Sequence, residues 1–314
     1  MIRSLIFTFC ICTITSWVHG QNRWAKMDSL FEGLPASLHV YRTTTAYDGR
    51  PFIAWYVEAD LSEKSLHFDT DTTFRRRLTP SQFHTKNGAP AVVVNGTFFS
   101  FATNQNLNLV IKNGNLVAQN VTSIQAKGKD SNSFYKVSRS AIGITKRGQA
   151  DVAWLLTDSS QRKAKAWQQQ PISRKDDFPG FAKNDTLWNK ARNWKMQTAI
   201  GGGPVLVHNG RGRITNDEER MFMGKAREDL HPRTAMGYTQ DGKLIILAVE
   251  GRRPGVAEGA SLTTLAQLLV ELNAQEALNL DGGGSSCLLV MGRETIRPSD
   301  KEGQRPVPGV FMIK

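Results

Sequence analysis

The pattern that most constrains the fold is a strand, a helix and a second strand in the last third of the chain. The apolar run at residues 244–249 predicts a buried strand. Residues 261–272 place apolar side chains at positions 262, 265, 266, 269 and 272, which is helical spacing, and Ser261 is typical of an N-cap. Another strand is expected at 277–280. This order predicts a βαβ crossover with two parallel strands and a right-handed connection.

An acidic residue follows each of these two strands, Glu250 after the first and Asp281 after the second. Parallel neighbours lie ~4.8 Å apart, or about twice that with one strand between them, and glycosidases use carboxylates at comparable separations. The carboxyl ends of such strands are also where α/β sheets bind ligands. We therefore predict Asp281 and Glu250 as catalytic residues. The alternative is that both only form turns, because a glycine follows each of them.

Two glycine runs are candidate binding turns. Glycines at 282–284 follow Asp281 directly and let the backbone approach a ligand, so we predict an anion cradle there. A second run at 201–203, followed by Pro204, is expected to line the same cavity. Neither run matches a phosphate loop or a dinucleotide fingerprint, and ordinary flexible loops remain the alternative. The binding residues predicted from these runs are Gly202, Gly203, Gly282, Gly283, Gly284 and Ser285.

Arg233, just before the first strand of the crossover, carries a planar guanidinium suited to bidentate phosphate binding. A structural ion pair is the alternative. The histidines are scattered without metal-ligand spacing, so the sequence predicts no zinc site and no cofactor. Calcium held by oxygen ligands such as Asp281 stays open, because it needs no short motif.

The first third of the chain is rich in expected strands. Residues 38–41, 52–57 and 66–68 predict an antiparallel meander. Residues 91–94 form a continuous apolar run, which predicts a strand buried on both faces with Asn95 at its tip. Asn113 and Gly114 predict a hairpin turn.

The N-terminus has the features of a signal peptide. Arg3 precedes an uncharged run at 5–18, and Val18 and Gly20 have the small-residue spacing of a cleavage site. We expect cleavage near Gly20 and a secreted or periplasmic protein, with lipid anchoring as a minor alternative. No stretch reaches the ~20 apolar residues that stable membrane insertion requires. Cleavage would leave Cys287 as the single cysteine, so no internal disulfide is expected.

The chain is basic, with 40 Lys and Arg against 28 Asp and Glu and a net charge of +12. This balance favours anionic partners such as phosphorylated glycans, envelope polymers or nucleic acid. Residues 160–196 concentrate nine Lys or Arg against three Asp, and we interpret them as a basic insertion, a solvated and partly helical flap. Nucleic acid is not expected as the partner, because no periodic stacking platform is visible and the protein is expected to be secreted.

Together these patterns predict the α/β class in its mixed α+β form. We expect a strand-rich single domain with mixed sheets, the C-terminal crossover and flanking helices. The expected organisation is a signal peptide at 1–20, an N-terminal strand-rich part at 21–90 and a main domain at 91–314 that contains the insertion at 160–196.

Several of these motifs occur together in an order that resembles the phosphodiester glycosidase family. They are Asn95-Gly96-Thr97-Phe98-Phe99, Gly201-Gly202-Gly203-Pro204, Pro232-Arg233-Thr234-Ala235, Glu250-Gly251-Arg252 and Asn279-Leu280-Asp281-Gly282-Gly283-Gly284-Ser285. The resemblance runs from about Val92 to the C-terminus. Two positions depart from the family pattern, which more often has a second glycine at Thr97 and often an aspartate at Glu250.

The resemblance implies a glycosidase that cleaves a sugar 1-phosphodiester, for example an N-acetylglucosamine-1-phospho-sugar, and releases the sugar and a phosphomonoester. We assign Asp281 as nucleophile or base and Glu250 as the second carboxylate. Arg233 and the amides of 282–284 would bind the phosphate, and Asn95 would bind a sugar hydroxyl. Arg252 is predicted as a further substrate-binding residue. The alternatives are a non-catalytic binder of anionic envelope polysaccharide and a metal-dependent phosphodiesterase.

Overall fold

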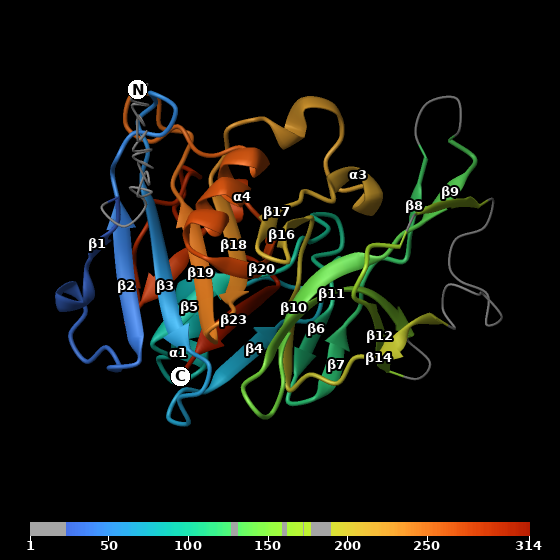
Figure 1. Cartoon of the computed structure of the whole chain (residues 1–314), viewed down its shortest axis with the longest axis horizontal. Helices are drawn as coiled ribbons and strands as arrows, with labels where there is room; N and C mark the ends of the chain where they lie inside the picture. The colour runs from blue at the N-terminus through green and yellow to red at the C-terminus, as the bar shows by residue number, and fades with distance from the viewer. Residues whose placement is uncertain (1–22, 127–130, 159–161, 172, 177–189) are drawn as a thin grey trace, which may run out of the picture.

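The computed structural model describes residues 23–126, 131–158, 162–171, 173–176 and 190–314 (Figure 1). These residues form four β-sheets, of eight, seven, five and three strands, with few helices. Every strand pair within the described ranges is antiparallel. The fold is therefore a mainly β single domain. The expectation of a strand-rich domain is confirmed, whereas the expected α/β class overestimated the helix content. The expected signal peptide lies outside the described residues.

The eight-stranded sheet contains the strands that position the predicted site. Its order is β1 (Ala25–Lys26), β2 (Leu38–Thr43), β3 (Ala54–Asp60), β19 (Lys243–Val249), β18 (Arg233–Thr239), β20 (Ala274–Asn279), β16 (Val205–His208) and β17 (Arg211–Gly212). The pairing of β2 with β3 confirms the first half of the expected meander. The third expected strand, at 66–68, overlaps only at Phe68 with the observed β4 (Phe68–Thr72), which joins the five-stranded sheet instead.

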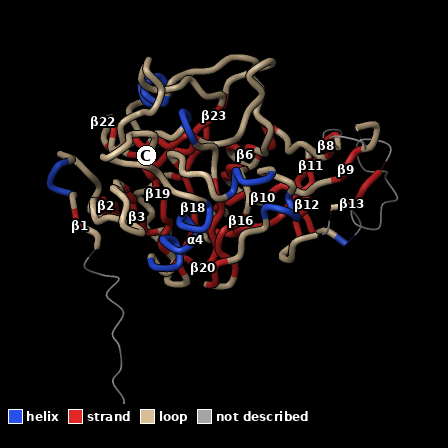
Figure 2. Tube along the Cα trace, turned by 90° about the horizontal axis from the view of Figure 1, so that it is seen from above, coloured by secondary structure: helices blue, strands red, loops and turns tan. Residues whose placement is uncertain are grey.

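The crossover between β19 and β20 has the expected strand directions. Both strands pair antiparallel with β18, which lies between them, so β19 and β20 are parallel to each other. They are connected through α4 (Leu262–Glu271), whose N-cap Ser261 accepts a 3.0 Å hydrogen bond from Thr264 N. The apolar face of α4 packs on the sheet, next to β18 and β20 (Figure 2). As a result, Glu250 and Asp281 both follow strands that end at the same edge.

The five-stranded sheet has the order β22 (Arg293–Glu294), β21 (Leu288–Val290), β5 (Val92–Asn95), β23 (Gly309–Ile313) and β4. All four residues of β5 are buried, which confirms the prediction from the apolar run. This sheet places Asn95 beside the turn that follows β20, because Asp281 N donates a 3.0 Å hydrogen bond to the carbonyl of Gly96.

The seven-stranded sheet has the order β14 (Arg192–Asn193), β12 (Lys163–Trp167), β11 (Ala150–Asp158), β10 (Arg139–Ile144), β15 (Thr198–Gly201), β6 (Val110–Lys112) and β7 (Asn115–Ala118). The hairpin of β6 and β7 turns at Asn113 and Gly114, both at positive φ, as predicted. The smallest sheet comprises β13 (Arg174–Asp176), β9 (Phe134–Lys136) and β8 (Ser123–Gln125), and β8 and β9 extend away from the body in Figure 1. The described part of the interval 160–196 contains three strands, and β12 and β13 pair with β11 and β9.

The remaining helices bounded within the described ranges are short. They are α1 (Pro80–Lys86), α3 (Asn216–Glu219) and the 3-10 helices η1 (Asp28–Leu30), η3 (Gly224–Arg227) and η4 (Gly283–Ser285). Among the described residues, no helix has the length and apolar character needed to cross a bilayer.

Glu219 is a fully buried carboxylate that joins the two largest sheets. Its Oε1 accepts hydrogen bonds from Trp154 Nε1 at 3.1 Å, Val205 N at 3.0 Å and Thr215 Oγ1 at 2.7 Å. Its Oε2 accepts from the backbone N and the hydroxyl of Ser140, at 3.0 and 2.9 Å. Burial raises the pKa of this carboxyl.

We expect Glu219→Gln to destabilise the fold, because the amide nitrogen would face N–H and O–H groups that now donate to an oxygen. The expected loss is about 3 kcal/mol in the free energy of unfolding, measured by denaturant titration. Glu218→Gln is the matched control, since Glu218 is the adjacent, half-buried carboxylate. Equal losses in the two variants would show that the hydrogen-bond network is not the cause.

Candidate active site

Three chain segments meet at the edge where β19 and β20 end. Arg233 at the start of β18 pairs with Val249, the residue before Glu250. Leu280 N donates to the carbonyl of Thr234 at 2.8 Å, and Gly283 N donates to the carbonyl of Pro232 at 2.8 Å. Residues 232–234, 249–250 and 280–283 are thereby fixed side by side, as expected from the crossover.

Asp281 is a half-buried residue at this edge, and its carboxyl group lies below the surface. Burial of its carboxyl raises the pKa to about 6, while Ser285, the Gly282 amide and the charge of Arg305 act in the opposite direction. Its Oδ1 accepts a 2.9 Å hydrogen bond from Gly282 N. A carboxyl with a pKa near neutrality is suited to proton transfer or to attack at neutral pH, and such groups concentrate at functional sites.

The glycine turn provides space for two arginines. A Cβ on Gly283, whose φ is +63°, would lie 2.8 Å from Nη2 of Arg252. A Cβ on Gly284 would lie 2.1 Å from Nη2 of Arg305. Two of the amides expected to cradle an anion are already used, since Gly282 N binds Asp281 and Gly283 N binds Pro232. The positive charge at the turn therefore comes mainly from guanidinium groups.

Arg305 and Asp300 were not recognised from the sequence. Arg305 donates from Nε and Nη2 to the two oxygens of Asp300, at 2.7 and 3.0 Å, which is a bidentate pair. The pair lies against Gly284, and the guanidinium carbon of Arg305 lies 5.5 Å from the ring centroid of Phe101. No local motif marks either residue. Both reach the site through the loop between β22 and β23.

Arg233 is 3% exposed, and its guanidinium forms hydrogen bonds with backbone carbonyl groups. Its Nε donates to the carbonyl of Ala260 at 3.0 Å, and its Nη2 donates to the carbonyl of Asp229 at 2.9 Å. Burial and the nearby charge of Arg252 lower the pKa of Arg233 to about 10. These contacts differ from the expected bidentate phosphate binding and give Arg233 a role in positioning the loop before β18.

Arg252 is the exposed arginine of the site. Its backbone is left-handed, with φ of 61°, a conformation that a residue with a Cβ adopts only at a cost. Its Nη1 makes one long hydrogen bond, at 3.4 Å, to the hydroxyl of Ser299. Together with Arg233, it contributes to lowering the pKa of His231, where burial is the largest cause. Arg252 thus combines proximity to the glycine turn with a guanidinium open to solvent.

Glu250 and Asn95 are held by internal partners. Glu250 is 4% exposed, forms an ion pair with Arg253 and accepts a 3.1 Å hydrogen bond from Arg297 N. Asn95 is fully buried and donates from Nδ2 to the carbonyl of Asp281 at 2.6 Å. Its Oδ1 accepts from Thr234 and from Cys287 N. These contacts hold the turns around Asp281 in place. They differ from the roles expected for the two residues, which were a second catalytic carboxylate for Glu250 and a sugar ligand for Asn95.

The second glycine run packs inside the protein. A Cβ on Gly202 would lie 2.3 Å from the carbonyl oxygen of Asn279, and a Cβ on Gly203 would lie 2.7 Å from Oε2 of Glu219. Both residues are buried, so they bring β15 close to β20 instead of lining a ligand cavity, in contrast to the expectation. Ser285, also predicted as a ligand, is 1% exposed behind the turn. In the described ranges, no group of three or more His, Cys, Asp or Glu residues is placed to hold a metal ion.

Known proteins resemble this chain in sequence and in fold. The chain is 37% identical over 68 residues to the N-acetylglucosamine-1-phosphodiester alpha-N-acetylglucosaminidase of Bos taurus, and 34% identical over 102 residues to that of Homo sapiens. These matches cover 22% and 32% of this chain but only 12% and 19% of the relatives, so it spans a small part of their length. The catalytic domain of the zebrafish enzyme, auto-inhibited by its pro-peptide, has a similar fold, with a TM-score of 0.58 at 20% identity over 88% of this chain and 82% of that one.

The model of the phosphodiester glycosidase family matches residues 87–314, which is well over half of the chain and includes the whole site at the edge of β18, β19 and β20. The resemblance recognised in the sequence motifs is confirmed by this match. The chain therefore belongs to the phosphodiester glycosidase family, a family of glycosidases.

Proposed function

We propose that this protein hydrolyses the bond between the anomeric carbon of a sugar and a phosphodiester. N-acetylglucosamine-1-phospho-sugars are the first substrates to test, because the names of the curated relatives specify that sugar. The observation that carries the proposal is Asp281, a carboxyl with its pKa raised to about 6, next to a glycine turn packed against two arginines.

The chemistry fits these groups. Water adds its oxygen to the anomeric carbon, the bond from that carbon to the phosphate oxygen breaks, and the phosphate leaves with the electron pair as a monoester. Its last ionisation lies near pH ~6, so it departs more easily than a sugar alcohol. Arg252 and Arg305 would stabilise the charge that develops on the phosphate. Asp281 would attack the anomeric carbon or take the proton of the water.

We assign the second carboxylate of the site to Asp300 in place of Glu250. Asp300 lies within reach of the glycine turn, because one of its oxygens would be 2.2 Å from a Cβ on Gly284. Its bidentate pair with Arg305 holds both charges in a fixed orientation. Glu250, in contrast, is buried and has both of its carboxylate oxygens engaged.

The test is turnover of a panel of sugar 1-phosphodiesters in ¹⁸O-labelled water. We expect the label in the released sugar, and we expect the rate to be unchanged by a chelator, since the proposed steps use no metal. Label in the phosphate would support the metal-dependent phosphodiesterase instead, whereas label in the sugar with loss of activity in the chelator would indicate a metal-dependent glycosidase. Binding of an anionic polysaccharide without any turnover would favour the non-catalytic alternative.

Phe101 offers a surface for the group on the far side of the phosphate. Its ring is 64% exposed, and the guanidinium carbons of Arg77 and Arg305 lie 5.4 and 5.5 Å from its centroid. The ring of Phe99 supports it, with 4.8 Å between centroids. Arg305 connects this aromatic surface to the glycine turn, so a sugar linked through the phosphate would pass over Phe101.

We expect Phe101→Ala to raise KM for a disaccharide phosphodiester about fivefold, because one stacking contact of roughly 1 kcal/mol is lost. The value of kcat should change little, and Phe101→Trp should restore KM. Leu30→Ala serves as the control, since Leu30 is an exposed apolar residue in η1. An unchanged KM for Phe101→Ala would exclude this surface from substrate binding.

Export belongs to the same proposal. It rests on residues 1–20, whose pattern predicts a cleaved leader, and a secreted or periplasmic enzyme would meet phosphorylated glycans outside the cytoplasm.

A further inference from the structure

A groove outside the candidate active site collects positive charge. Two pockets of about 450 Å³ each are neighbours, because Lys146 and Gln197 line both of them, and we treat the two as one groove. We call it the basic groove. It lies along one end of the seven-stranded sheet, at the turn that joins β10 to β11, and none of its lining residues belongs to the site around Asp281.

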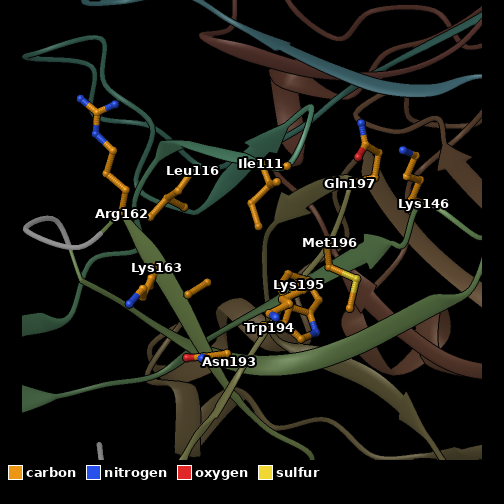
Figure 3. A pocket seen from close by; sticks show the side chains of 12 residues that line it. Ile111, Leu116, Lys146, Arg162, Lys163, Asn193, Trp194, Lys195, Met196 and Gln197 are labelled. Carbon is orange, nitrogen blue, oxygen red and sulfur yellow. The ribbon is translucent and has the colours of Figure 1, made fainter.

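The cations of the basic groove come from four separate chain segments. They are Lys64, Lys146, Arg147, Arg162, Lys163 and Lys195, and all six side chains are exposed. Figure 3 shows Arg162 and Lys163 on one side of the first pocket and Lys146 on the other. The one carboxylate in the lining is Glu63, which accepts a hydrogen bond from Ser65 N at 2.9 Å. The groove therefore has an excess of five positive charges.

Three of these cations have no carboxylate partner among the described residues. Elsewhere, lysines such as Lys86, Lys243 and Lys314 form ion pairs with aspartates at 2.6 to 2.8 Å. No such pair with a described residue is formed by Lys146, Arg147 or Lys195. Like charges gathered in a concave surface focus the electrostatic potential, and the groove therefore attracts anions.

The floor of the first pocket favours a saccharide over a nucleic acid. It contains Ile111, Leu116 and Met196, which offer apolar contact but no ring. Trp194 is only 7% exposed, and its Nε1 donates to Asp151 at 2.6 Å, so its face is not open for a base to stack on. Proteins that bind single strands without sequence preference normally combine positive charge with exposed aromatic rings.

We propose that the basic groove binds an anionic polysaccharide, a linear chain with repeated phosphate or carboxylate groups. The groove is a second binding site, separate from the catalytic one. Binding there holds a polymer on the enzyme while its sugar phosphodiester bonds encounter the site at Asp281, which raises their local concentration. The inference does not depend on the reaction, because binding is measured directly.

The experiment compares two charge-reversal pairs by fluorescence anisotropy with labelled polymers. Lys146→Glu with Lys195→Glu changes the groove. Arg211→Glu with Arg213→Glu is the matched control, because both arginines are exposed and lie at or next to β17 in the eight-stranded sheet. The probes are a phosphodiester-linked polysaccharide, a polyuronate, a neutral dextran and an oligodeoxythymidine of similar length. Melting temperatures establish that every variant is folded.

We expect the groove variant to bind the anionic polysaccharides at least about tenfold more weakly than wild type at low salt. The control pair should change binding less than about twofold, and dextran should not bind. Stronger binding of the phosphodiester polymer identifies phosphate as the recognised group, and stronger binding of the polyuronate identifies carboxylate. Undiminished binding by the groove variant overturns the proposal, as does tighter binding of the oligonucleotide than of either anionic polysaccharide.

Discussion

Replacing Asp281 with Asn is expected to lower kcat/KM for a sugar 1-phosphodiester on the order of 10³-fold or more. Asn has the same size and keeps an oxygen that can accept the 2.9 Å hydrogen bond from Gly282 N. It cannot attack the anomeric carbon or take a proton from water. Unchanged turnover of the Asn variant would remove Asp281 from the mechanism.

The pH dependence of the wild-type enzyme tests the same assignment. Because burial raises the pKa of Asp281 to about 6, the carboxyl is ionised above that pH and protonated below it. A nucleophile or base must be ionised, so kcat/KM should fall about tenfold for each pH unit below 6. A rate that rises towards pH 5 would mean that Asp281 acts as an acid.

Stability should change in the opposite direction to activity. The folded-state pKa of Asp281 is raised, so the unfolded chain loses this proton at lower pH than the folded one. The wild-type protein therefore loses up to about 3 kcal/mol of stability as the pH rises from about 4 to about 6. Asn does not titrate. We expect Asp281→Asn to be more stable than wild type at pH 7 and to show no such gain at pH 4, measured by denaturant unfolding.

The sequence predicted the elements of the crossover well, because their signals are local. The helical spacing after Ser261 and the apolar run of β19 depend only on neighbouring residues. The parallel directions of β19 and β20 followed from the chirality and length of the connection. The intervening β18 was not predicted as their shared neighbour, because strand order in a sheet depends on contacts between distant segments.

The sequence predicted which chain segments meet at the site, but it predicted only some of the side-chain contacts there. The sequence indicates that Glu250 and Asp281 follow equivalent strands, but not that Arg253 and Arg297 N occupy the oxygens of Glu250. Asp300 was missed for the same reason, since its contact with Gly284 forms only in the folded chain. The α/β class was overestimated because it was taken from the single βαβ crossover and expected flanking helices, whereas most described elements are strands.

Arg252 and Arg233 should respond differently to the same substitution. Arg252 is exposed and has one weak internal partner, whereas Arg233 is buried and donates to two backbone carbonyls at 3.0 Å or less. A lysine can place a charge but cannot present a planar fork of donors. The change at position 252 is therefore expected to weaken phosphate binding, and the change at position 233 is expected to lower the stability of the fold.

We expect Arg252→Lys to lower kcat/KM on the order of 100-fold, because less charge stabilisation reaches the phosphate. The melting temperature should change little, because a left-handed backbone conformation costs Lys and Arg the same free energy. Arg233→Lys should lose about 2 kcal/mol of unfolding free energy, since the loop carbonyls of Ala260 and Asp229 lose charge-assisted donors. Arg211→Lys is the control for both, as an exposed arginine on the edge strand β17. The reverse pattern is a stable but inactive Arg233→Lys and a fully active Arg252→Lys. It would indicate that Arg233, and not Arg252, binds the phosphate of the substrate. That result would require its buried guanidinium to release the loop carbonyls when substrate binds.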